Sequence, residues 1–402
     1  MPMISVAEAL ERVLAPLRPT GAETVPLAAG WGRTLAAPVV ARLRQPPADM
    51  SAMDGYAVRA ADATAGARLR VAGAAPAGHP FAGVLGPGEA VRLFTGSVVP
   101  PGADAVVIQE DTRPEGGSVV VTEAAVSGRH IRPAGQDFAE GDELVAAGTR
   151  LGARDIGLAA AGNTPWLSVR RRPRVAILAT GDEIALPGEP IAPGGIVSSN
   201  AHALAALVLA AGCEPTVLPI AGDRREAIAE AADAAKGADL LVTTGGASVG
   251  EHDLVQAGLG ERGFQLDFWT VAIRPGKPLI SGSVGGVPVM GLPGNPVSAL
   301  VCGLVFLYPA LARLLGRTDA APRATALLGA ALPANDRRED YMRATLHVQG
   351  DGTLVATPFP RQDSGMLRTL ARAQALIVRP PFAAPAAEGE PMPIIRLDTL
   401  LA

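Results

Sequence analysis

Strand-like and helix-like segments alternate along the second half of the chain, and this alternation constrains the fold more than any other feature. RVAILAT, EPTVLPI and ADLLVTT are apolar enough to be buried strands, and two helical patterns lie between them, SNAHALAALVLAAG and DRREAIAEAADAAK. A helix from Asp253, strands near Phe268 and Val289 and a helix from Pro296 follow. Strands that alternate with helices form parallel sheets, because each crossover returns the chain to the same end of the sheet. We therefore predict a central, doubly wound α/β domain over residues 173–319.

The rest of the chain carries strand patterns without this alternation. Short valine-rich runs between Gly and Pro turns predict an inserted β-rich domain over 51–130. The flanking segments, 1–50 and 131–172, look more helical, and we expect them to close into one elongated, mixed linker domain. Two strand patterns around a Gly-Asp-Gly turn and a final strand predict a C-terminal β-barrel over 320–402. A chain of 402 residues accommodates these four domains as a multidomain α/β plus β protein.

The charge and composition argue against several classes of function. A formal net charge of -4 and an aromatic content of 3% are poor for a nucleic-acid partner, which needs positive charge and stacking rings. Cys213 and Cys302 lie far apart in the sequence, and no two of the five histidines have metal-ligand spacing. We therefore expect reduced thiols, no zinc site and a cytoplasmic location.

Two apolar stretches could be mistaken for targeting or membrane segments. The N-terminus, MPMISVAEALERVLAPL, is no signal peptide, because Glu8, Glu11 and Arg12 interrupt its apolar core. It predicts an amphipathic helix with Ser5 and Glu8 as a capping box. The segment VSALVCGLVFLYPALARLL is broken at Pro309, which leaves its apolar part too short to cross a bilayer. We predict a buried helix there and no membrane partner.

A turn and a helix start follow the last strand of the α/β segment, in GLPGNPVSAL. Asn295 is a good N-cap and Pro296 suits the first helical position. Pro293 and Gly294 let the backbone come close to a ligand, so free helix amides could bind an anion here. The alternative is a well-formed helix cap with nothing bound.

Two cations precede this turn, in AIRPGKPL. Arg274 and Lys277 flank Pro275 and Gly276, which fix them on a stiff loop. A planar guanidinium and a point-charge ammonium together suit a tetrahedral oxyanion. Solvated surface cations are the alternative, but their place beside a helix start favours an oxyanion site.

Acidic side chains follow three successive strands of the same domain. Asp182 and Glu183 lie in TGDEI, Asp223 lies in AGDRRE, and Asp253 lies in TTGGASVGEHD. Asp223 could instead form a capping box with Glu226, and Asp253 could cap its own helix. Carboxylates that meet at one edge of a sheet, beside cations, favour Mg²⁺ that bridges to a phosphate. The GDE triplet of EGDELVAAG lies away from this sheet and predicts a turn.

Two further turns carry polar side chains near the β-rich domain. MSAMDGYAV places Asp54 at a glycine turn before Tyr56, and FTGSVVPPGAD offers Thr95 and Ser97 as hydrogen-bond donors. From chemistry alone these turns are weak signals of function, because Asp-Gly pairs are common in turns of every kind.

The chain as a whole resembles a known family through eight motifs: SAMDGYAV, FTGSVVPPGADAVV, RPAGQDFAEGD, ATGDEI, SSN, TTGGASVGEHD, RPGKPL and GLPGNPVSAL. In this order and spacing they are similar to the molybdopterin molybdenumtransferases of the bacterial MoeA family, which are related to the E domain of gephyrin. The resemblance implies that molybdate is inserted into adenylylated molybdopterin, with Mg²⁺ as cofactor and release of AMP. It implies a molybdopterin-binding-like α/β domain and a homodimer with its active site between subunits. It also implies contact with the molybdopterin adenylyltransferase.

The resemblance assigns roles to individual residues. The catalytic residues implied are Asp54, Thr95, Asp137, Glu183, Asp223 and Asp253, of which Glu183, Asp223 and Asp253 would hold the metal. The residues implied to bind the cofactor substrate and the oxyanion are Thr244, Gly245, Gly246, Ser248, Arg274, Lys277, Pro278, Pro293, Gly294, Asn295, Pro296, Arg343 and Ser364. The chain departs from the family at Thr270, where some members carry lysine, and at Arg274, which replaces a frequent lysine.

Two other functions remain open on the sequence. The molybdopterin adenylyltransferase shares the α/β fold and the TTGG motif, but it is expected to be a single small domain without SAMDGYA. A gephyrin-like dimeric scaffold is a different class of function, although the sequence has no long linker or receptor-binding extension. ATP-dependent adenylylation of free molybdopterin would identify the adenylyltransferase. Cofactor production that does not require the acidic residues would identify the scaffold.

Overall fold

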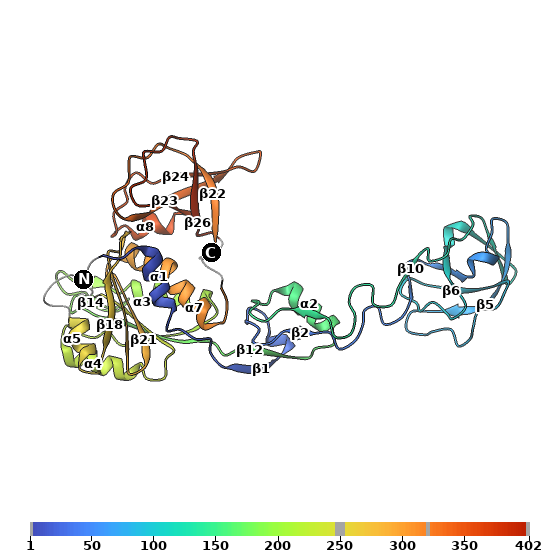
Figure 1. The fold of residues 1–402 in the computed structure, drawn as a ribbon, viewed down its shortest axis with the longest axis horizontal. Helices are drawn as coiled ribbons and strands as arrows, with labels where there is room; N and C mark the ends of the chain where they lie inside the picture. The colour runs from blue at the N-terminus through green and yellow to red at the C-terminus, as the bar shows by residue number, and fades with distance from the viewer. Residues whose placement is uncertain (1–2, 246–253, 319–321, 399–402) are drawn as a thin grey trace. The chain divides into compact units, whose positions relative to one another are not determined.

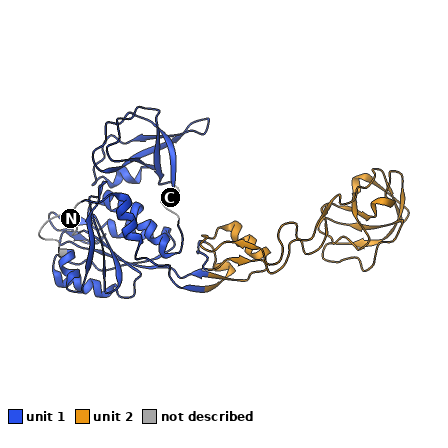
Figure 2. Ribbon diagram, in the orientation of Figure 1, with its two compact units in different colours: residues 1–23, 32–36, 169–402 blue, residues 24–31, 37–168 orange. Residues whose placement is uncertain are grey.

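The computed structural model describes residues 3–245, 254–318 and 322–398, and the chain divides into two compact units (Figure 2). Unit 1 comprises residues 1–23, 32–36 and 169–402, and unit 2 comprises residues 24–31 and 37–168. A multidomain protein with α/β and β parts is confirmed. The finer division into four domains remains a prediction.

A six-stranded sheet that includes β18 and β21 forms the centre of unit 1 (Figure 1). Its strand order is β16-β13-β17-β21-β20-β18. The strands β16, β13, β17 and β21 pair in parallel, which confirms the predicted doubly wound arrangement. The edge of the sheet departs from the parallel arrangement expected from the alternation, because β18, β20 and β21 pair antiparallel. The strands are β13 (Arg174–Ala179), β16 (Glu214–Val217), β17 (Leu240–Thr244), β18 (Gln265–Thr270), β20 (Pro278–Val284) and β21 (Val287–Leu292).

A two-residue hairpin turn explains the antiparallel edge. Gly285 and Gly286 have φ angles of 56° and 83° and lie between the paired residues Val284 and Val287. Positive φ at both positions is typical of the tight turns that join antiparallel neighbours. The segment before this turn forms β20, a strand that the sequence analysis missed.

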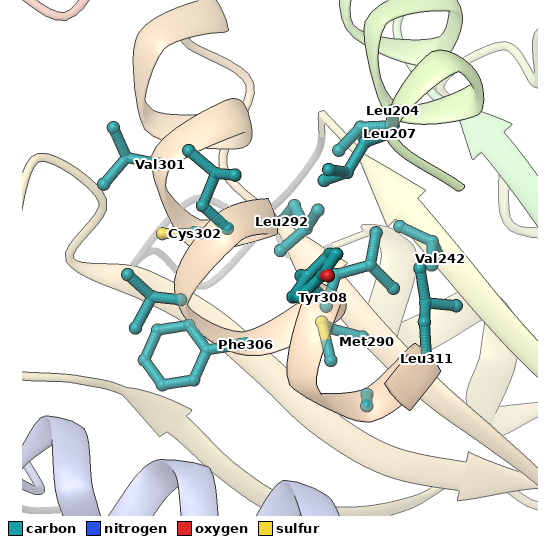
Figure 3. Packing of buried hydrophobic residues seen from close by; sticks show 14 of the residues in the cluster. Leu204, Leu207, Val242, Met290, Leu292, Val301, Cys302, Phe306, Tyr308 and Leu311 are labelled. Carbon is teal, nitrogen blue, oxygen red and sulfur yellow. The ribbon is translucent and has the colours of Figure 1, made fainter. Parts of the chain in front are cut away.

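Helices cover both faces of this sheet, because alternate strand residues are buried on opposite sides. Val175 and Ile177 of β13 belong to one apolar core, whereas Ala176 and Leu178 belong to the other. The first core also holds side chains of α3, of the helical segment that begins at Pro296 and of β17 and β21 (Figure 3). The helices are α3 (Asn200–Ala210), α6 (Pro296–Cys302) and α7 (Tyr308–Leu314) on the first face, and α4 (Arg225–Ala234) and α5 (Leu254–Gly260) on the second.

One helix of unit 1 is continuous where the sequence predicted a break. Residues 296–314 form a helix of 19 residues, in which a π-helical segment, Gly303–Leu307, joins α6 to α7. Pro309 has no amide hydrogen to donate, and the π-helical segment lies just before it, where the hydrogen-bond pattern of the helix changes. By length and composition this helix could cross a membrane, but 89% of its most apolar window is buried inside the protein. Its burial confirms the prediction of a core helix.

The N-terminal helix, α1 (Val6–Leu14), has the predicted N-cap, whereas the Glu8 carboxylate of the predicted capping box accepts from the Arg12 guanidinium at 2.8 Å. Ser5 is its N-cap, and the Ser5 hydroxyl accepts a 3.1 Å hydrogen bond from the Glu8 amide. Its buried face, which includes Val6 and Val13, packs in the first core of the α/β sheet. Residues 1–23 therefore belong to unit 1, and the predicted pairing of 1–50 with 131–172 in one linker domain remains a prediction.

A small β-barrel follows the α/β domain in unit 1. Its strands pair in the order β23-β24-β22-β26-β25, and β25 also pairs with β23, which closes the barrel and confirms the prediction. A further strand, β19 (Ile273–Arg274), joins β23 from outside the barrel. The barrel strands are β22 (Arg323–Leu328), β23 (Glu339–Val348), β24 (Leu354–Pro358), β25 (Ala375–Arg379) and β26 (Pro391–Arg396), and the helix α8 (Leu367–Ala371) lies between β24 and β25.

Unit 2 contains the predicted β-rich domain. Its six-stranded sheet has the order β7-β4-β6-β5-β9-β8 and two apolar cores. The strands are β4 (Gly55–Val58), β5 (Arg68–Ala75), β6 (Glu89–Leu93), β7 (Ala105–Ile108), β8 (Thr112–Glu115) and β9 (Ser118–Val121).

The segments that flank this sheet are less helical than predicted. They contain one α-helix, α2 (Ala153–Ala161), within the fully described residues 24–31 and 37–168. Their frequent Gly and Pro residues interrupt helical runs, so short strand pairs prevail. The strands are β2 (Val39–Val40) with β11 (Glu143–Val145), β3 (Met50–Ser51) with β10 (Ile131–Arg132), and β1 (Ala22–Pro26) with β12 (Trp166–Arg170).

Candidate active site

A cavity of about 950 Å³ lies in unit 1, where the carboxyl ends of β13, β17 and β21 face the C-terminal barrel. Ligands of open α/β sheets bind at this edge. Many of the predicted site residues line it, namely Glu183, Thr244, Gly245, Arg274, Lys277, Pro278, Pro293, Gly294, Asn295, Pro296 and Ser364. Further lining residues that the sequence analysis did not assign to the site include Ser198, Asn200, Arg338, Gln362 and Asp363.

Glycine is required at the rim of this cavity, after β17. Gly245 has a φ of 95°, and a side chain there would collide with the carbonyl oxygen of Thr180. A Cβ atom on Gly294 would lie 3.6 Å from the Cα of Gly245, so the two loops approach each other closely. Gly246, Ser248 and Asp253 of the same predicted motif lie outside the described residues.

The helix start at this edge differs from the predicted anion site. Asn295 has the extended conformation of an N-cap, with φ -68° and ψ 131°, but its side chain makes no capping hydrogen bond. The amide of Val297 donates to the carbonyl oxygen of Ser364 in the barrel, at 3.1 Å. Because Pro296 has no amide hydrogen and the Val297 amide is already bonded, the first two positions of this helix offer no free amide to an anion.

Arg274 makes ion pairs across the cavity wall to the barrel. Its guanidinium donates to Asp340, to the side-chain oxygen of Asn335 at 3.1 Å and to Asp336 at 3.3 Å. The hydrogen bond to Asp340 is the main cause that raises the pKa of Arg274. Arg274 and Asp340 are also partners in the β19–β23 strand pair. Arg274 therefore fastens the barrel to the α/β domain, and its predicted role as an oxyanion ligand is not supported by its contacts.

Removal of the negative charge at Asp340 should loosen this attachment. The Asp340 side chain is 10% exposed and that of Arg274 is 41% exposed, so we expect Asp340→Asn to destabilise the protein by about 1–2 kcal/mol, less than for a fully buried pair. The thermal unfolding midpoint of the full chain measures this. The matched control is Asp233→Asn, which breaks the ion pairs of Asp233 with Lys236 and Arg262 and should change stability by less than about 0.5 kcal/mol. Equal effects of the two variants would contradict the assignment.

A second arginine of the cavity wall, Arg338, is held by Asp336. The Asp336 carboxylate accepts hydrogen bonds from the Arg338 guanidinium and backbone amide, both at 2.8 Å. These bonds lower the pKa of Asp336 from 3.8 to about 2. Since the folded-state pKa is depressed, the stabilisation is present above pH 4 and is lost only as the pH falls toward about 2.

Lys277 is the cavity-lining cation that remains available to an anion. Its side chain is exposed, and no carboxylate of the described residues forms an ion pair with it. Arg274 and Arg338 are both paired with carboxylates, which offset their charge. An oxyanion in this cavity would therefore meet its least compensated positive charge at Lys277.

The predicted acids do not all reach the cavity. Glu183 lines it, in the loop after β13. Asp223 does not line it, and its amide instead donates to Asp182 Oδ1 at 2.9 Å. The alternative role of Asp223 in a capping box with Glu226 is wrong, because the helix cap is Arg224, without a side-chain bond. Among the described residues no three potential metal ligands gather, so the Mg²⁺ site of Glu183, Asp223 and Asp253 remains a prediction.

The two predicted contacts from the barrel differ in position. Ser364 lines the cavity. Arg343 is 1% exposed and does not line it; its Nε atom donates to Gln362 Oε1 at 3.1 Å. Burial lowers the pKa of Arg343. Because Gln362 itself lines the cavity, Arg343 supports the wall from behind and is not itself a contact residue.

The predicted site residues of unit 2 include a hydrogen-bonded pair. The Asp54 carboxylate accepts hydrogen bonds from the Thr95 amide at 2.7 Å and from the Thr95 hydroxyl at 2.8 Å. The amide bond is the main cause that lowers the pKa of Asp54. The guanidinium of Arg92, which the sequence analysis missed, lies over the rings of Tyr56 and Phe94, 5.0 and 5.3 Å from their centres. Two turns far apart in the sequence are thus brought together.

Asp137 is the third predicted site residue of unit 2. It is exposed, and its amide donates to the carbonyl oxygen of Gln45 at 2.9 Å. Its carboxylate has no hydrogen-bond or ion-pair partner among the described residues. The participation of Asp54, Thr95 and Asp137 in one site with the residues of unit 1 remains a prediction.

Family models match nearly the whole chain. The MoeA N-terminal region (domain I and II) matches residues 4–162, a probable molybdopterin binding domain matches residues 176–313, and the MoeA C-terminal region (domain IV) matches residues 325–397. The last two matches contain the residues that line the cavity.

Individual proteins are similar over the same extent. A molybdopterin molybdenumtransferase from Nostoc sp. is 38% identical over 89% of this chain and 85% of its own length. Molybdopterin molybdenumtransferase 2 from Mycobacterium tuberculosis is 39% identical over 93% of this chain and 95% of its own length. The crystal structure of a molybdopterin biosynthesis MoeA protein from Pyrococcus horikoshii is 32% identical, with a TM-score of 0.85 over 98% of this chain and 99% of that one.

Proposed function

The chain belongs to the MoeA family of molybdopterin molybdenumtransferases, and on this premise we propose that it inserts molybdate into adenylylated molybdopterin and releases AMP, with Mg²⁺ as cofactor. Relatives that carry this name are similar over most of both chains. The observation that carries the proposal is the cavity of unit 1, which is lined by Glu183, Lys277 and Ser364 at the carboxyl edge of the sheet. It offers a carboxylate, a cation and a hydroxyl in the lining of one cavity.

The side chains that line the cavity have different chemical roles in this proposal. Lys277 supplies the positive charge that attracts molybdate, a doubly charged tetrahedral oxyanion. Ser364 and Thr244 carry hydroxyls at this wall, and Gly245 leaves room for the substrate to approach the backbone. Together they hold the two substrates in contact, so that a reaction between separate molecules becomes one within a complex.

Glu183 fits a role as metal ligand because it is a carboxylate at the cavity wall, with no ion-pair partner among the described residues. Mg²⁺, when bound, would polarise the phosphoanhydride of the adenylylated substrate. Asp223 and Asp253 are proposed as the other ligands on the family resemblance. The structure describes only Asp223 of these two, outside the cavity lining.

The proposal extends to assembly and location. A homodimer would combine the cavity of unit 1 with the Asp54–Thr95 pair and Asp137 of a second subunit's unit 2. Contact with the molybdopterin adenylyltransferase would deliver the substrate, and the reaction would take place in the cytoplasm. These statements rest on the family resemblance.

AMP release from purified adenylylated molybdopterin, with and without molybdate and Mg²⁺, tests the function. Release that requires both ions and yields active cofactor is the expected result. ATP consumption on free molybdopterin would instead identify an adenylyltransferase. A protein that releases no AMP, although cofactor synthesis in cells still depends on its presence, would point to the scaffold.

A further inference from the structure

One asparagine connects two loops at the cavity. Asn200 is the first residue of α3 and lines the cavity, in the SSN motif to which the sequence analysis gave no role. Its side-chain amide donates two hydrogen bonds, to the Thr244 hydroxyl at 2.9 Å and to the carbonyl oxygen of Gly294 at 2.7 Å. Both hydrogens of the amide are therefore used, each on a different loop.

The two loops follow neighbouring strands of the sheet. Thr244 ends β17 and pairs with Leu292 of β21, which Gly294 closely follows. The Thr244 hydroxyl is buried and also lies 3.3 Å from the carbonyl oxygen of Pro293. Since it accepts from Asn200, it is free to donate its own hydrogen to Pro293. A chain of hydrogen bonds thus runs from α3 through the end of β17 to the loop after β21.

Asparagine is suited to this position because both of its partners accept. A carboxylate of the same shape has no hydrogen to give, and it would place negative charge against the carbonyl oxygen of Gly294. Alanine would leave the buried Thr244 hydroxyl without one partner. A Cβ atom on Gly294 would be in van der Waals contact with the Cα of Gly245, at 3.6 Å, so the two loops that Asn200 joins lie next to each other.

We propose that Asn200 is a positioning residue that fixes the Thr244 hydroxyl and the Gly294 carbonyl in the geometry that the reaction requires. This inference rests on the proposed function of the cavity. Asn200 acts through its two partners and need not touch the reacting atoms. Loops held within fractions of an ångström keep the substrates aligned, and the loss of alignment lowers the rate of the chemical step.

The test combines kinetics with hydrogen exchange on the full chain. Asn200→Ala and Asn200→Asp should lower kcat for AMP release roughly tenfold or more, with Asn200→Asp the worse of the two. In both variants, amide hydrogen exchange should become faster in residues 240–245 and 293–297 and should stay unchanged in residues 174–179 of β13. In the Thr244→Val variant, a further Asn200→Ala change should lower kcat much less than it does in the wild type, because the two side chains belong to one hydrogen-bond network.

His202→Ala is the matched control, because His202 is exposed on the same turn of α3 and lies outside the cavity lining. It should leave both kinetics and exchange unchanged. Wild-type kcat in Asn200→Ala, unchanged exchange in both loops, or full additivity with Thr244→Val would each overturn the inference. If the wild type itself releases no AMP, the proposed function fails, and the exchange of the two loops still decides whether Asn200 holds them.

Discussion

Lys277→Ala should raise the apparent KM for molybdate about 100-fold, because it removes the one cavity-lining cation that the described carboxylates leave unpaired. A hydrogen bond to a charged group contributes about 2–3 kcal/mol, which corresponds to that factor. Lys277→Arg keeps the charge but changes its shape, so an intermediate KM is expected. Steady-state AMP release over a range of molybdate concentrations measures both variants.

The chain provides a closely matched control for this experiment. It contains one other lysine, Lys236, which is 78% exposed and pairs with Asp233 on α4. Lys236→Ala removes the same charge from the same unit and should leave the KM for molybdate unchanged. An equal rise in both variants would mean that overall charge attracts molybdate, and an unchanged KM in Lys277→Ala would exclude Lys277 as its ligand.

The features of the fold that depend on short, local sequence patterns were predicted from the sequence. Alternating strands and helices revealed the parallel half of the sheet, and Ser5 with Glu8 revealed the start of α1, because each signal lies within a few residues. Glu183 follows the parallel strand β13 and lines the cavity at the carboxyl edge, as such a position leads one to expect, and its role in the site remains a prediction. The barrel was predicted from its strand patterns in the same way.

The sequence is least informative where interaction partners lie far apart along the chain. The sequence predicts Arg274 as an oxyanion ligand on a stiff loop, but its guanidinium is bound to Asp340, 66 positions further along the chain. Arg343 has the same chemistry at first sight, yet burial places it behind Gln362. Neither contact can be inferred from the residues that are near Arg274 or Arg343 in the sequence. The role of Asn200 was missed for a related reason, because its partners follow two strands that become neighbours only in the folded sheet.

Glu183→Gln should lower AMP release about 1,000-fold at a fixed Mg²⁺ concentration, because the amide keeps the shape of the side chain but is a much weaker metal ligand. A bound metal contributes several kcal/mol to the stabilisation of developing charge, and each 1.4 kcal/mol corresponds to a factor of ten in rate. The loop should keep its conformation, since the Glu183 carbonyl oxygen accepts from the Ile196 amide at 2.8 Å whichever side chain is present. Rates measured across a Mg²⁺ titration provide the test.

Loss of a ligand and loss of a general electrostatic effect predict different titrations. If Glu183 holds the metal, the Mg²⁺ concentration for half-maximal activity rises in Glu183→Gln and part of the rate returns at high Mg²⁺. The control is Glu214→Gln, at the exposed start of the edge strand β16, which removes one charge without touching the cavity and should leave the titration unchanged. If the rate of Glu183→Gln falls by the same factor at every Mg²⁺ concentration, Glu183 contacts the substrate and other acidic residues hold the metal.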